Sequence, residues 1–124
     1  MTSTIRSITI DCAAPTRLAG FWAAATGYVP GEADDRDEVA VLTDPAGGPR
    51  LLFLKVPEGK TVKNRVHLDL RPAETMEAEV ERLIGLGATR VRVVQESSDD
   101  LFTVMQDPEG NEFCVERGAL DRRS

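Results

Sequence analysis

The only histidine of the chain stands in an alternating apolar and polar stretch, "NRVHLDLRP", two residues before an aspartate. Successive side chains of a strand point to opposite faces, so Val66, Leu68 and Leu70 share one face, and His67 and Asp69 share the other. Histidine side chains exchange protons near neutral pH, and a carboxylate partner fixes the tautomer of the ring. We therefore predict that His67 and Asp69 form a reactive or ligand-binding pair, unless the ring is a core residue that faces a helix.

The elements that must position this pair form an internal repeat. Alternating or apolar stretches predict strands over 5–12, 28–32, 38–43, 50–56, 65–71, 89–95, 101–106 and 112–117, and helical spacing predicts helices from Pro15 to Gly27 and over 73–86. The helix-ending glycines Gly27 and Gly87 lie 60 residues apart, and the turns "DPAGG" and "DPEGN" lie 63 residues apart. The order is thus β-α-β-β-β twice.

This repeat defines two modules, 5–56 and 65–117, joined by the polar linker 57–64. The acidic stretch "GEADDRDE" is predicted to be a surface loop, and the tail "GALDRRS" is expected to fray. A helix covers only one face of each predicted sheet. Two such sheets could line a cleft with their second faces, and His67 would then face that cleft.

Composition excludes several classes of protein. A chain of 124 residues fits one domain, and a net charge of −6 with dispersed acidic residues argues against nucleic acid as a partner. No apolar run reaches the roughly 18 residues of a membrane span, and "MTSTIRSITID" lacks the pattern of a secretory signal, so we expect a cytoplasmic location and no membrane partner. Cys12 and Cys114 are expected to be buried thiols, because no CxxC or Cys/His cluster accompanies them.

Four segments together resemble one known superfamily. They are "SITIDCAAPTRLAGFWAAATGY", "NRVHLDLRP", "EAEVERLIGLGATRV" and "DPEGNEFCV". The set is similar to the vicinal oxygen chelate superfamily, and most of all to its small glyoxalase-like proteins near the bleomycin-resistance and extradiol-dioxygenase group. The resemblance implies an α+β fold over 1–124, in which two tandem βαβββ modules form cupped mixed sheets around a cavity. It also implies a small-molecule ligand and a homodimer.

The resemblance further implies four metal-ligand positions, two in each module, where the superfamily's metalloenzymes carry His and Glu. Here these positions hold Ser7, Leu51, His67 and Cys114. Leucine cannot bind a metal and neutral serine binds one poorly, which leaves two soft or borderline donors. We therefore expect no catalytic metal and no other cofactor, although a divalent ion such as Zn²⁺ or Cu²⁺ could still bind this incomplete set.

Side chains near these positions are expected to line a mostly apolar cavity with a few polar groups, as is usual for small-molecule sites. The predicted ligand-binding residues are Ser7, Thr9, Leu51, Phe53, His67, Asp69, Glu112 and Cys114.

Two functional hypotheses follow for this cavity. The first is a metal-free protein that captures a small organic molecule, as drug-sequestering members of the superfamily do. The second is a metal-independent or weakly metal-assisted isomerase, lyase or dehydratase, in which His67 is the general base and Asp69 or Glu112 orients it. A third reading, association through a protein surface, is the least favoured, because the outer face of the second helix, "EAEVER", is charged.

Overall fold

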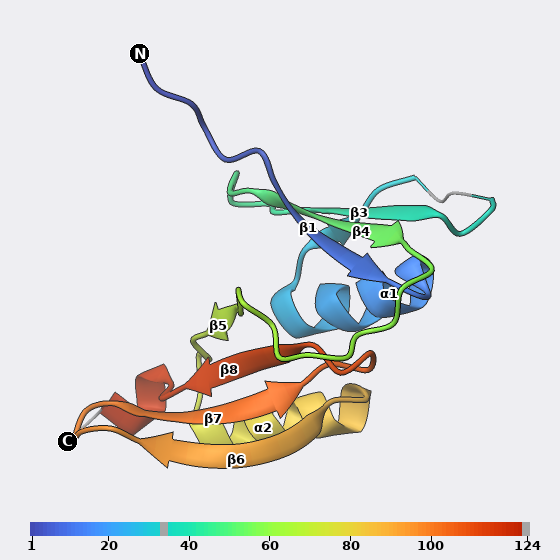
Figure 1. Cartoon of the computed structure of the whole chain (residues 1–124). Helices are drawn as coiled ribbons and strands as arrows, with labels where there is room; N and C mark the ends of the chain where they lie inside the picture. Colours follow the sequence, from blue (N-terminus) through green and yellow to red (C-terminus); the bar gives the residue numbers. More distant parts are fainter. Residues whose placement is uncertain (33–34, 123–124) are drawn as a thin grey trace. The chain divides into compact units, whose positions relative to one another are not determined.

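The computed structural model describes residues 1–32 and 35–122, and the remaining residues, Ala33, Asp34, Arg123 and Ser124, lie outside its described part. The chain divides into two compact units, Met1–Lys60 and Thr61–Ser124, and their boundary falls within 57–64. Each unit has the order β-α-β-β-β and contains one four-stranded mixed sheet (Figure 1). The predicted α+β fold with two tandem modules is confirmed.

The first unit contains one helix and four strands. They are β1 (Ser7–Cys12), α1 (Pro15–Thr26), β2 (Val29–Pro30), β3 (Val39–Thr43) and β4 (Arg50–Lys55). The strand order is β1-β4-β3-β2, and β1 runs parallel to β4. As predicted, α1 begins at Pro15 and ends at Gly27, which takes up a φ of 80° that favours glycine.

The core of the first unit lies between α1 and its sheet. Leu18 and Trp22 of α1 are buried, as are Leu42 of β3 and Phe53 of β4. The ring of Trp22 also meets the ring of Phe21 edge to face, with centroids 5.3 Å apart. One face of this sheet is therefore fixed by the apolar stripe of its helix.

The second unit repeats this topology. Its elements are β5 (Asp69–Leu70), α2 (Met76–Leu86), β6 (Thr89–Gln95), β7 (Leu101–Gln106), β8 (Glu112–Glu116) and the 3₁₀ helix η1 (Ala119–Arg122). The strand order is β5-β8-β7-β6, and β5 runs parallel to β8. The buried side chains of Val80 and Leu83 on α2 pack on the sheet face that also buries Phe113 and Val115 of β8.

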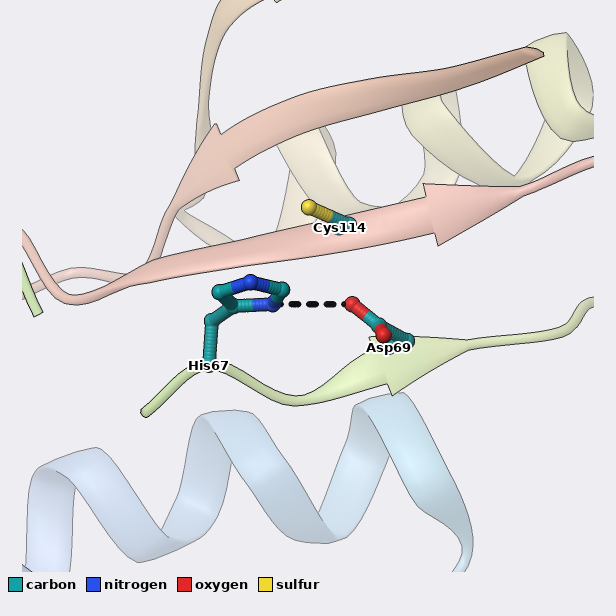
Figure 2. Close-up of side chains that lie close together, drawn as sticks. All are labelled: His67, Asp69 and Cys114. Atoms are coloured by element: carbon teal, nitrogen blue, oxygen red, sulfur yellow. Dashed lines mark hydrogen bonds and ion pairs between the residues drawn. The ribbon is translucent and has the colours of Figure 1, made fainter. Parts of the chain in front are cut away.

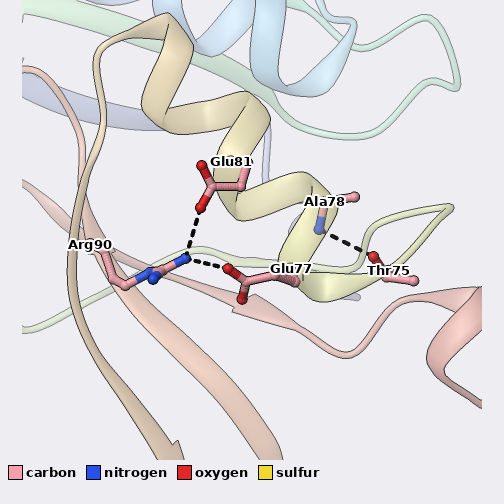
Figure 3. A network of polar contacts seen from close by, with 5 residues as sticks. All are labelled: Thr75, Glu77, Ala78, Glu81 and Arg90. Atoms are coloured by element: carbon pink, nitrogen blue, oxygen red, sulfur yellow. Dashed lines mark hydrogen bonds and ion pairs between the residues drawn. The ribbon is translucent and has the colours of Figure 1, made fainter.

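Polar contacts hold α2 in place (Figure 3). The side-chain oxygen of Thr75 accepts a hydrogen bond from the Ala78 amide at 3.1 Å, which caps the first turn of the helix. Arg90 of β6 donates to the carboxylates of Glu77 and Glu81 on the outer side of α2, at 2.6 and 3.2 Å. These pairs are exposed, so they contribute less to stability than the buried stripe does.

Two parts of the second unit differ from the sequence prediction. The strand expected over 65–71 is reduced to Asp69–Leu70, and Val66 is 75% exposed instead of packing against the helix. The tail, expected to fray, forms η1 where it is described. Asp121 of η1 accepts hydrogen bonds from the amides of Met76 and Gly118, at 2.6 and 2.8 Å, so the C-terminal segment is tied to the start of α2.

None of the helices in the described ranges combines the length and the apolar character that a membrane span requires.

Candidate functional site

The pairing of β5 with β8 decides which side chains of the second unit can meet. Asp69 is aligned with Cys114, and Leu70 is aligned with the fully buried Val115. Aligned residues of neighbouring strands share a face. Asp69 and Cys114 therefore lie on the face of the sheet that α2 does not cover, which we call the distal face.

His67 lies on the same side, just before β5, and its ring points toward Asp69 and Cys114 (Figure 2). Its Nδ1 is 2.9 Å from Oδ1 of Asp69. The predicted placement of His67 and Asp69 away from the helix is confirmed. Because Asp69 can only accept a hydrogen bond when ionised, this contact places a proton on Nδ1 and leaves the lone pair of the neutral ring on Nε2.

Cys114 completes a cluster of three different donor types. One donor atom from each of His67, Asp69 and Cys114 lies within 4.8 Å of the other two. The side chains of His67 and Asp69 are 41% and 47% exposed, whereas Cys114 is buried within the sheet. The cluster thus combines one fixed sulfur with two groups that can adjust.

Burial raises the pKa of the Cys114 thiol above its ordinary value, and the negative charge of Asp69 and a hydrogen bond to its carboxylate raise this pKa further. The positive charges of Lys63 and Arg92 act in the opposite direction but do not outweigh these effects. Cys114 is therefore a thiol at neutral pH, and a poor nucleophile unless something removes its proton.

A pocket of about 320 Å³ opens beside this cluster. The residues that line it are His67, Asp69, Arg71, Asp99, Asp100, Leu101, Phe102, Cys114, Glu116 and Arg122. Leu101 and Phe102 supply apolar surface, and Arg71 forms an ion pair with Glu116 at 3.3 Å. With that pair neutralised, the carboxylates of Asp69, Asp99 and Asp100 outweigh the one remaining guanidinium, that of Arg122.

The predicted site residues of the first unit do not form a matching cluster. Ser7 is aligned with Arg50, and its Oγ accepts a hydrogen bond from Nε of Arg50 at 2.7 Å. Thr9 is exposed and is aligned with Leu52. The face that these residues share offers a hydroxyl, a guanidinium and an apolar side chain.

Leu51 and Phe53 were expected on the ligand-facing side, and the structure corrects this. They are aligned with Ile8 and Ile10, and they are buried in the core under α1, with exposures of 3% and 0%. The register makes Leu52 the counterpart of Cys114, because Leu52 is aligned with Thr9 as Cys114 is with Asp69.

The reason for this error is the length of one turn. The turn between β3 and β4 spans 44–49, whereas that between β7 and β8 spans 107–111, which is one residue shorter. A shift of one residue moves every side chain of a strand to the other face. Apolar residues occupy both parities of "RLLFLK", so the sequence pattern could not reveal the shift.

Glu112 lies two residues before Cys114 on β8, but it does not line the pocket. Its Oε1 accepts a hydrogen bond from the Asn64 amide at 2.9 Å. Among the partners considered for His67, the structure therefore supports Asp69.

Several pocket residues were missed by the sequence analysis. Arg71 lies two positions beyond Asp69, so the alternation of the strand could have identified it. Asp99 and Asp100 lie in the segment between β6 and β7, and Arg122 lies in η1. No periodic pattern marks these positions in advance.

Comparisons with known proteins agree with the observed topology. A family model described as a glyoxalase-like domain matches residues 7–116. Among curated proteins, none matches the chain significantly.

Solved structures share the fold at low sequence identity. A glyoxalase/bleomycin resistance protein/dioxygenase family enzyme from Burkholderia phytofirmans PsJN is 18% identical, with a TM-score of 0.72 over 95% of this chain and 100% of that chain. The fosfomycin resistance protein FosX from Listeria monocytogenes, complexed with Mn(II) and 1S,2S-dihydroxypropylphosphonic acid, is 11% identical, with a TM-score of 0.74 over 99% of this chain and 95% of that chain. TioX from Micromonospora sp. ML1 is 15% identical, with a TM-score of 0.61 over 93% and 98% of the two chains.

The residues of this chain do not fit a hard ion such as Mn²⁺ at the four positions implied by the resemblance. Mn²⁺ favours carboxylate, carbonyl and water ligands. The hydroxyl of Ser7 accepts a hydrogen bond from the guanidinium of Arg50, and Cys114 presents a thiol. The second position of the first unit holds a leucine in either case: Leu51 if it is counted from the turn, and Leu52 if it is taken from the strand alignment. Of the four positions, only that of His67 holds a residue type, His or Glu, that the superfamily's metalloenzymes carry there.

Proposed function

We propose that this chain, which belongs to the glyoxalase-like domain family, binds a small organic molecule in the pocket on the distal face. Binding does not use a catalytic metal. The observation that carries this proposal is the pocket of about 320 Å³, which combines the apolar surface of Leu101 and Phe102 with polar groups that converge from several elements. That volume is at the lower end of the range of small-molecule sites, which favours a compact ligand.

The charges of the pocket favour a ligand with a positive group. Arg71 is already paired with Glu116, and Asp69 is paired with His67. The carboxylates of Asp99 and Asp100 then outweigh the guanidinium of Arg122 and can attract an ammonium or guanidinium group, while Phe102 can contact its apolar part. A drug-sequestering role of the bleomycin-resistance kind is one form that such binding could take.

The test is a thermal-shift screen of metal-free protein against ammonium, guanidinium, carboxylate and phosphonate compounds, followed by calorimetry of each hit. We expect hits among the cations, and we expect Phe102→Ala to abolish them. Val93→Ala is the matched control, because Val93 is an exposed residue of the same sheet that does not line the pocket. A screen without hits, or hits that bind Phe102→Ala as tightly as the wild-type protein, would contradict the proposal.

The hydrogen bond of 2.9 Å between His67 and Asp69 supports a second candidate function, that of an isomerase, lyase or dehydratase. With Nδ1–H donated to Asp69, Nε2 of His67 can accept a proton from a bound molecule, as a general base does. Asp69 would stabilise the imidazolium that forms, so this proton transfer would need no metal.

Proton exchange distinguishes the enzyme from the binder. Each hit is incubated with the protein in D₂O, and loss of C–H signals or appearance of products is followed by NMR. If His67 is the base, His67→Gln abolishes exchange and leaves binding within a few-fold. Asp69→Asn lowers the exchange rate by less than His67→Gln does. Binding without exchange for every hit would leave only the binding function.

Assembly and location are predictions that follow from the family and the sequence. We propose a homodimer and a cytoplasmic location, without nucleic-acid or membrane partners. Light scattering of the purified protein tests the dimer.

A further inference from the structure

We propose that His67, Asp69 and Cys114 form a binding site for a thiophilic divalent cation, Zn²⁺, within the second unit alone. The three side chains offer an imidazole nitrogen, a carboxylate oxygen and a sulfur, which are the donor types that zinc uses in proteins. One donor atom from each lies within 4.8 Å of the others (Figure 2). Asp69 is outside the four positions that the family resemblance implies, and all three ligands come from the second unit.

The geometry requires only a small contraction. Zinc–sulfur bonds of about 2.3 Å and zinc–nitrogen or zinc–oxygen bonds of about 2.0–2.1 Å place tetrahedral donors roughly 3.3–3.6 Å apart. The observed separations of up to 4.8 Å must therefore shorten by about 1 Å. Cys114 is held by pairing of β8 on both sides, whereas His67, just before β5, and Asp69, its first residue, have half-exposed side chains that can move toward it.

The charges of the site suit zinc better than a hard cation. Binding breaks the S–H bond of Cys114, releases that proton to solvent and forms a zinc–thiolate bond. The thiolate and the carboxylate of Asp69 together neutralise the two positive charges of the ion. Mn²⁺ and Mg²⁺ prefer six oxygen ligands, so one thiolate, one imidazole and one carboxylate should bind them weakly.

Zinc bound here would also engage His67 and fill part of the pocket. It would then inhibit the organic-ligand binding or the proton transfer proposed above. This consequence rests on the proposed function, but the binding of zinc does not, because it can be measured without any organic ligand.

The experiment titrates the metal-free full-length protein with Zn²⁺ by calorimetry, with Mn²⁺ and Mg²⁺ as comparisons, and with Co²⁺ as a spectroscopic probe. We expect one Zn²⁺ per chain, binding of Mn²⁺ and Mg²⁺ at least tenfold weaker, and a sulfur-to-cobalt charge-transfer band. His67 is the only histidine of the chain, and Cys12 and Cys114 are its only cysteines, so few variants assign the ligands.

Each ligand has its own variant, and the second cysteine provides the control. Cys114→Ser should abolish the charge-transfer band, and His67→Gln and Asp69→Asn should each weaken zinc binding by at least about tenfold, the scale seen even for outer-shell groups. Cys12→Ala should leave both the band and the affinity unchanged.

Alkylation of the wild-type protein provides a second readout if Cys114→Ser does not fold. Zinc should slow the reaction of iodoacetamide at Cys114, located by peptide mass spectrometry, at least tenfold, and leave the reaction at Cys12 unchanged. The proposal is overturned if no stoichiometric zinc binds, if Mn²⁺ binds equally well, if the band survives in Cys114→Ser, or if zinc fails to protect Cys114.

Discussion

A substitution at Thr103 of β7 tests which side chains of β7 and β8 face α2 and which face the pocket. Thr103 is aligned with Val115, so it points toward α2, and its exposure is 0%. Its hydroxyl has no hydrogen-bond partner within 1–32 and 35–122. The neighbours of Thr103 in the strand, Phe102 and Val104, point to the distal face, where Phe102 lines the pocket and Val104 is aligned with Cys114.

Thr103→Val should therefore stabilise the protein. Burying a hydroxyl without a hydrogen bond costs about 1–3 kcal/mol, and valine replaces that group by a methyl of similar size. We expect a gain of about 1–2 kcal/mol in the free energy of unfolding by urea. For a chain of this length, about 1 kcal/mol corresponds to a rise of roughly 4 °C in Tm.

Thr89→Val is the control, because Thr89 is an exposed residue of β6 in the same sheet. It should change the free energy of unfolding by less than about 0.5 kcal/mol. If Thr103→Val is neutral or destabilising while the control behaves as expected, the hydroxyl is solvated or paired in solution. The assignment of Phe102 and Cys114 to the opposite, pocket-lining face would then lose its support.

Three further predictions concern the second unit. Hydrogen bonds from the amide of Gly118, and to a smaller extent from that of Met76, lower the pKa of Asp121 in the folded protein. The ionised Asp121 therefore stabilises the fold above the pKa of an unfolded aspartate, and this stabilisation is lost as the pH falls through the lowered folded pKa. Asp121→Asn should hence lower the free energy of urea unfolding at pH 7 but not in strong acid, and a loss that is the same at both pH values would contradict this. Asp69→Asn should speed the alkylation of Cys114 at a fixed, mildly alkaline pH, since it removes a charge and a hydrogen bond that raise the thiol pKa, and an unchanged rate would refute that cause. Gly118→Ala should destabilise the protein by more than about 1 kcal/mol, because a Cβ there would overlap the Glu74 carbonyl, whereas Gly20→Ala, in open space on α1, should be neutral or stabilising.

Much of the fold could be predicted because local signals agree with the tertiary structure. Pro15 and Gly27 bound α1, and Gly87 follows α2 with a φ of 119°, as the helix signals indicated. The repeated strand–helix order predicted two modules of the same kind, and in both of them the structure pairs the first strand parallel to the last. The same alternation placed His67 and Asp69 on one face.

The remaining features depend on contacts that no local pattern encodes. The strand around His67 is shortened to Asp69–Leu70, and the amide of Asn64 before it is bound by the Glu112 side chain instead of a neighbouring strand. The C-terminal segment forms η1, in which Asp121 accepts a hydrogen bond from the amide of Met76, a contact across 45 residues. Asp99 and Asp100 reach the pocket from a connecting segment, where side-chain direction has no fixed period.

The turn between β3 and β4 shows why the donors of the candidate site lie in one unit only. A turn one residue shorter, as in the second unit, would move the side chains of β4 to the opposite faces of the sheet, and Leu51 and Phe53 would leave the core under α1. The longer turn therefore places Leu51 and Phe53, instead of Leu52 and Leu54, in the core under α1. With that register Leu52 is aligned with Thr9, and Arg50 binds Ser7, so the first unit presents no nitrogen or sulfur lone pair at these positions. The donor groups of the candidate site therefore come from the second unit, where the same alignment brings Cys114 beside Asp69 and His67.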